Sequence, residues 1–257
     1  MGSYQEFDEF LRRASEDENL GNKNNWFFVF RKAMDGFHNR AEAVRMHDTL
    51  LHGWIPKKRG PEDSEYHISA MLFNMDSALE CLTFALNSFG KVVNSQFFSI
   101  SDKDNLKKVS PKNITQEFIY QSRKKHSDIF IGYKNLFPRL QEYWILKVEM
   151  QNIIIANHDV SKHRHSIYSS GLRNTSAPHN FYEQLGIKGV VQEEHLYWPM
   201  KEVILQKDPK ETLDKQDPKN TILLEELTAI FFEFINESGK KIFQDMEDYF
   251  EKNPFKK

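Results

Sequence analysis

The chain has 257 residues, within reach of one large helical domain, and 39% of them are hydrophobic, which is enough to bury a core and excludes wholesale disorder. Its 11 glycines and 9 prolines make up about 8% of the chain, against an average of roughly 12%, and this scarcity of turn residues disfavours an all-β protein. The formal net charge of −2 gives no overall basic character, and the single cysteine, Cys81, excludes an internal disulfide framework and a cysteine-rich metal site.

A first helix is predicted over residues 25–51. Apolar side chains recur three or four residues apart between Trp26 and Leu51, which is typical of a helix with one buried face. Asn25 suits the N-cap of this helix, and Gly53 suits its C-terminal end.

A second helix is predicted over residues 65–89, with Ser64 as its N-cap and Gly90 just past its end. Apolar residues cover a wide arc of this helix, so we expect it to lie at the centre of a helical bundle. Cys81 lies within it and is interpreted as a small buried hydrophobic residue.

Two further helices are predicted after an exposed connection over residues 91–112. Asn113 and Gln116 have the spacing of a capping box, which predicts a third helix that continues to about residue 135. Pro138 interrupts the pattern and favours the first turn of a fourth helix over residues 138–165.

Residues 169–217 are rich in loop-forming residues and are interpreted as an irregular insertion. Within it, residues 188–192 and 202–206 have the composition of short strands, which predicts a small β or irregular element near residues 186–207.

A final helix is predicted over residues 218–250, with Asp217 at its N-cap, Pro218 in its first turn and an acidic outer face. Together these segments predict a mainly all-α protein: a single bundle of about five main helices over residues 1–257, with the small insertion at 169–217.

No segment has the features of a targeting or membrane-spanning sequence. The N-terminus is acidic, and the densest apolar run, residues 153–156, is far shorter than the roughly 20 residues that a spanning helix needs. We therefore expect a cytoplasmic protein.

The sequence also lacks the phosphate-binding loop, the dinucleotide-binding fingerprint and the nucleophile elbow, which disfavours the common nucleotide-binding and hydrolase folds.

A histidine-rich polar segment ends the predicted fourth helix. It contains Asn157, His158, Asp159, Lys162, His163, Arg164 and His165. Three interpretations remain open for this segment. It can be a polar helix C-terminus, where cations offset the helix dipole. It can be a metal site, in which Asp159 and His163 share a helix face and His47, His52 or Asp48 adds a ligand. It can also be a phosphate or RNA site, because imidazoles transfer protons near neutral pH and basic side chains hold phosphate.

Two short motifs resemble the signature of the HEPN superfamily, in which an arginine and a polar residue precede a histidine by about four to six positions. Arg173 to His179 fits the letters, although Gly171 and Pro178 place it in a loop. Asn157 to His163 lies at the end of an apolar helix, with Asn157 where the arginine is expected. The part of the chain that resembles this all-α superfamily is residues 65–89 and 138–165.

The resemblance implies that the chain binds RNA or a nucleotide and that it could be a metal-independent endoribonuclease, with no cofactor. Carried over to this sequence, the catalytic group would be His163, Arg164 and Asp159, and the phosphate-binding group would be Lys162, Asn157 and His158. The resemblance also implies a homodimer, which we expect to form through the second and fourth helices.

Two alternatives belong to other classes of function. One is a non-catalytic interaction or scaffold protein that uses the same fold. The other is a helical-bundle metal-dependent hydrolase that uses His47, Asp159 and His163.

Overall fold

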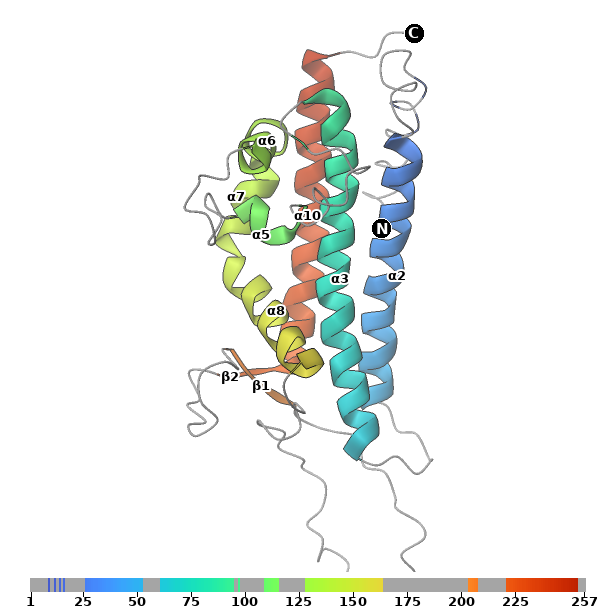
Figure 1. Ribbon diagram of the computed structural model, residues 1–257, viewed down its shortest axis with the longest axis vertical. Coiled ribbons are helices and arrows are strands. Elements are labelled where there is room, and N and C mark those ends of the chain that lie inside the picture. The colour runs from blue at the N-terminus through green and yellow to red at the C-terminus, as the bar shows by residue number, and fades with distance from the viewer. Residues whose placement is uncertain are drawn as a thin grey trace, which may run out of the picture. The chain divides into compact units, whose positions relative to one another are not determined.

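The computed structural model confirms an all-α protein (Figure 1). It describes residues 26–52, 61–94, 97, 109–115, 128–163, 203–207 and 221–253, together with Glu9, Arg12, Ala14 and Glu16. Within these residues it contains seven helices and two three-residue strands. None of the helices in this part of the chain is both long enough and apolar enough to cross a membrane.

The chain divides into two compact units. Unit 1 comprises Met1–Asn39, Ser77–Glu149 and Phe231–Lys257, and unit 2 comprises Arg40–Asp76 and Met150–Ile230. The long helices α2, α3 and α10 contribute residues to both units.

Helices α2 and α3 follow the predicted first and second helices. Helix α2 spans Trp26–His52, as predicted to within a residue at each end. Helix α3 spans Pro61–Val93 and therefore continues past Gly90, which the sequence placed just beyond its end. The wide apolar arc of α3 is buried, from Ile68 to Phe89.

Gly90 is a packing residue rather than a helix terminator. A Cβ atom at Gly90 would lie 2.5 Å from Cδ1 of Phe97, and a Cβ atom at Gly132 would lie 2.9 Å from Cε2 of the same ring. Phe97 is 1% exposed and also contacts Tyr133, with 5.2 Å between the ring centroids. The two glycines thus leave the space that this ring fills in unit 1.

The predicted third and fourth helices are each represented by shorter helices. Helices α5 (Pro111–Thr115) and α6 (Asp128–Leu136) lie within or beside the predicted third helix, and the residues between them lie outside the described part of the chain. The fourth helix is divided into α7 (Pro138–Leu146) and α8 (Val148–His163). Pro138 lies in the first turn of α7, as predicted.

A single helix over residues 138–165 is therefore wrong, because the helical backbone is interrupted at Lys147. This residue has φ −105° and ψ 18°, and its N–H donates to the carbonyl of Tyr143 at 3.1 Å. Neither glycine nor proline lies at the interruption, so no local breaker marks it in the sequence.

The small sheet joins the insertion to the final helix. Strand β1 (Ile204–Gln206) confirms part of the predicted strand at 202–206, and it pairs antiparallel with β2 (Thr221–Leu223). The other predicted strand, at 188–192, lies outside the described residues. Helix α10 spans Leu224–Lys252, so its predicted start at residue 218 is wrong. Residues 221–223 find their backbone partners in β1, and the N–H of Leu224 donates to the carbonyl of Val203 at 2.8 Å.

Buried polar side chains connect the short helices of unit 1 to one another and to α10. The side-chain amide of Gln141 donates to the carbonyls of Ile114 and Phe130, both at 2.9 Å. The carboxylate of Asp245, on α10, accepts from the N–H groups of Arg139 and Leu140 at 3.3 and 3.0 Å. Asp245 therefore caps the N-terminus of α7 from another helix.

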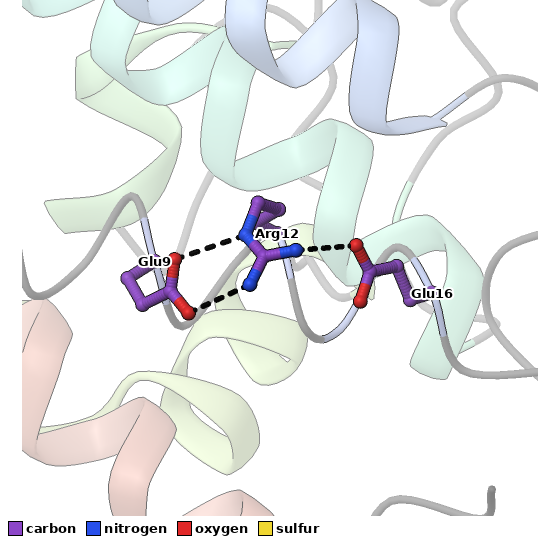
Figure 2. A network of polar contacts seen from close by, with 3 residues as sticks. All are labelled: Glu9, Arg12 and Glu16. Atoms are coloured by element: carbon purple, nitrogen blue, oxygen red, sulfur yellow. Dashed lines mark hydrogen bonds and ion pairs between the residues drawn. The ribbon is translucent and has the colours of Figure 1, made fainter.

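An exposed ion-pair network lies near the N-terminus (Figure 2). Arg12 contacts Glu9 at 2.8 Å and Glu16 at 2.5 Å, and the guanidinium side chain is 54% exposed. The hydrogen bonds to Glu9 and the charge of Glu16 raise the pKa of Arg12 further above its ordinary high value. Water and salt screen such exposed pairs, so this network contributes little to stability.

Candidate functional site

Residues 157–163 of the histidine-rich segment form the end of α8 in unit 2. Asn157, His158 and Asp159 are described there. Arg164 lies outside the described residues, as do the side chains of Lys162 and His163. The motif from Arg173 to His179 also lies outside them. The predicted catalytic group is therefore represented by Asp159, which is half-buried.

His158 forms a histidine–carboxylate contact with α3. Its Nδ1 atom lies 2.7 Å from Oδ2 of Asp76, and both side chains are largely buried, at 11% and 14% exposure. When Nδ1 carries a hydrogen, it donates to this carboxylate and the ring is held in one orientation. The other nitrogen, Nε2, is then the atom that can exchange a proton with a ligand.

Phe73 connects this histidine to an arginine of α2. The Phe73 and His158 rings meet edge to face, with 5.4 Å between their centroids. The Cζ atom of Arg40 lies 5.0 Å from the centroid of the same phenyl ring. Phe73 is 39% exposed, so the ring also reaches the surface of unit 2.

Asn74 completes the arrangement. Its Oδ1 atom accepts from Nη1 of Arg40 at 3.1 Å, while its Nδ2 atom donates to the carbonyl of Ala70 at 2.7 Å. We refer to Arg40, Phe73, Asn74, Asp76 and His158 as the Phe73 cluster. It combines the guanidinium group of Arg40 with an imidazole held by a carboxylate.

Asn157 makes a hydrogen bond within its own helix. Its Nδ2 atom donates to the carbonyl of Ile153 at 3.0 Å, and the residue is only 3% exposed. In the same turn, the Ser161 hydroxyl donates to the carbonyl of His158 at 2.8 Å. Asn157 is thus buried and bonded to the backbone of its own helix.

A second histidine contact joins α2 to α3 in unit 2. The Nδ1 atoms of His47 and His67 lie 2.9 Å apart, and each residue is 7% exposed. Such a contact needs one N–H donor and one lone pair, so the pair is not doubly protonated while it persists. Burial lowers the pKa of His47.

The metal-site interpretation gains no support from the described residues. Among them, no group of three or more His, Cys, Asp or Glu side chains is arranged to hold a metal ion. His47 contacts His67, whereas the side chains of His52 and His163 lie outside the description.

Four members of the Phe73 cluster were not identified by the sequence analysis. They are Arg40, Phe73, Asn74 and Asp76, of which the last three lie on α3. Asn74 and Asp76 are polar residues within the largely apolar stretch 70–79 of α3, and this local interruption is the signal that could have identified them. Arg40 gave no comparable signal, because an exposed arginine is ordinary on a surface helix.

No family model matches the sequence, and neither the curated proteins nor the solved structures contain a significant match.

Proposed function

We propose that this protein is a HEPN-like helical domain that binds RNA or a nucleotide and cleaves RNA without a metal ion. The contact between His158 and Asp76 carries the proposal, because a carboxylate that holds Nδ1 orients an imidazole for proton transfer through Nε2. The all-α fold is consistent with the HEPN resemblance.

The proposed reaction transfers two protons. One imidazole takes the proton of a ribose 2′-hydroxyl, whose oxygen attacks the adjacent phosphorus. The bond from phosphorus to the 5′-oxygen breaks, and a second group acts as an acid and donates a proton to that oxygen. His158 and His163 are the proposed base and acid, while Lys162 and Arg164 stabilise the charge on the phosphate oxygens.

The experiment measures cleavage of a fluorogenic RNA by the full chain in the presence of a metal chelator. We expect His158→Ala to reduce the rate about 100-fold or more, the usual contribution of a positioned acid or base. Asp76→Asn leaves the imidazole in place without its carboxylate and should reduce the rate by a smaller factor. His38→Ala is the matched control, because His38 is an exposed histidine on α2 outside the cluster.

A wild-type chain that cleaves no RNA between pH 5 and 8 would contradict the catalytic part of the proposal. Equal rates for His158→Ala and His38→Ala would contradict the role given to His158.

The second candidate is a non-catalytic binding domain with the same fold. The environment of Asn157 favours it, because this residue is buried and bonded within α8 where the HEPN motif has an arginine. RNA binding without cleavage, measured by fluorescence polarisation of a labelled oligonucleotide, would select this candidate.

A further inference from the structure

Arg40 differs from three other arginines of the described residues in the kind of partner that it contacts. Arg12, Arg45 and Arg139 each contact at least one carboxylate. Within the part of the chain that the structure describes, the hydrogen bond of Arg40 goes to the neutral amide oxygen of Asn74. This partner orients the guanidinium without neutralising its charge.

The guanidinium of Arg40 is also held in place from two directions. Asn74 is only 5% exposed, and its bond to the Ala70 carbonyl directs its Oδ1 atom toward Arg40. The Phe73 ring contacts the guanidinium by a cation–π interaction. A side chain that is already ordered loses less conformational entropy when it binds a ligand.

We propose that Arg40 is a phosphate-binding residue of the Phe73 cluster and takes a backbone phosphate of a single-stranded RNA. This inference rests on the proposed function. Nη1 of Arg40 donates to Asn74. The Nε and Nη2 atoms of Arg40 form the other edge of the guanidinium, which can donate two parallel hydrogen bonds to phosphate oxygens. His158 contacts the same phenyl ring, which brings the imidazole and the bound phosphate to one surface.

The exposed part of Phe73 adds a second contact for the same ligand. Aromatic rings bind single-stranded nucleic acid by stacking on its bases, whatever the sequence. Phe73 is 39% exposed while it supports Arg40 and touches His158. A base next to the bound phosphate would therefore meet this ring.

The test is equilibrium binding of a short fluorescein-labelled RNA to the full chain over a range of salt concentrations. Arg40→Ala should weaken binding about tenfold or more and lower the slope of log K against log salt by about 0.7, the loss of one phosphate contact on a single strand. Arg40→Lys keeps the positive charge but cannot donate two parallel hydrogen bonds to one phosphate. It should therefore keep the salt dependence of the wild type and bind RNA with an affinity between those of the wild type and Arg40→Ala. Arg31→Ala, which removes an exposed arginine of the same helix, is the control.

The outcomes separate this inference from the function on which it rests. If the wild type binds RNA and Arg40→Ala binds it with the same affinity and slope, the inference about Arg40 is overturned and RNA binding stands. If Arg40→Ala weakens binding but the wild type does not cleave, the inference stands and the catalytic part of the proposed function fails. If the wild type binds neither RNA nor inorganic phosphate, both fail. Circular dichroism of each variant shows whether it is folded.

Discussion

At the scale of single residues, two histidine contacts in unit 2 differ in what they can do. His158 contacts a carboxylate, which holds its ring in one orientation. His47 contacts another histidine in a buried position, where a second proton would place two positive charges side by side. The first contact suits proton transfer, whereas the second makes stability depend on pH.

We expect the His47–His67 contact to weaken the protein in mild acid. Burial lowers the pKa of His47 in the folded state. As the pH falls, His47 is therefore protonated in the unfolded chain before it is protonated in the folded protein. The stabilising contribution is fully present above the unfolded pKa of about 6.5 and is lost as the pH falls below it, with a slope of up to about 1.4 kcal/mol per pH unit. Urea denaturation of the wild type between pH 7.5 and 5 measures this slope.

His47→Asn is the informative variant, because its amide nitrogen can take the place of Nδ1 without titrating. It should flatten the dependence of unfolding free energy on pH, whereas His38→Asn, at an exposed position of α2, should retain the wild-type dependence. Identical profiles for the wild type and His47→Asn would contradict the assignment.

At the scale of the elements, the sequence predicts long periodic helices well and their interruptions poorly. Helix α2 is predicted almost to the residue, because its apolar spacing is continuous and the sequence on either side contains residue types that favour helix ends. The interruption at Lys147 and the pairing of β2 with β1 are not predicted, because both depend on backbone partners that local composition does not reveal.

The same limit applies to the candidate site. The end of α8 could be identified from the sequence as a candidate site, because histidines are concentrated in that short segment. The partner of His158 could not be predicted, because Asp76 lies 82 residues earlier in the chain and only the packing of α8 against α3 brings them together. A single sequence contains no information on which polar residues of distant helices face each other.

Gly90→Ala tests whether the buried Phe97 ring leaves room for a side chain at this position of α3. Alanine favours a helix over glycine by up to about 1 kcal/mol, but its Cβ atom would lie 2.5 Å from the buried Phe97 ring. We expect overpacking to dominate and the unfolding free energy to fall by about 1–3 kcal/mol. Chemical denaturation measures the difference.

Two further variants serve as controls for Gly90→Ala. In Gly36→Ala the nearest atom to the new Cβ would be Sγ of Cys81, at 3.1 Å, so its cost should be smaller. In the double variant Gly90→Ala with Phe97→Leu, a smaller side chain relieves the clash, and the two changes should cost less than the sum of their separate effects. A stabilised Gly90→Ala would show that the ring moves freely and that propensity dominates.

At the scale of the whole molecule, the proposed function favours a symmetric assembly. Two copies of the segment from Lys162 to Arg164 facing one groove would bring the phosphate-binding cations of both chains to the site, and a two-fold dimer is the commonest symmetric arrangement. We expect contact through α3 and α8 and not through α10, where exposed acidic residues such as Glu225, Glu233 and Glu251 would oppose each other.

Light scattering after size exclusion measures the assembly directly. A homodimer has about twice the 30.4 kDa mass of the chain. Because exposed Tyr66 lies on α3 outside the Phe73 cluster, Tyr66→Asp should shift the dimer toward monomer, whereas Ala229→Asp, at an exposed position of α10, should not. A monomeric mass for the wild type at micromolar concentration would contradict the shared site.

The cap that Asp245 places on α7 also sets an order of events during synthesis. Asp245 follows Leu140 by 105 residues, so α7 leaves the ribosome long before its N-terminal amides can meet this carboxylate. Until α10 has emerged, the start of α7 can bond only to water or to temporary partners. Unit 1 therefore reaches its final arrangement only after translation has passed the last helix, and a nascent chain stalled before that point would hold α7 without its cap.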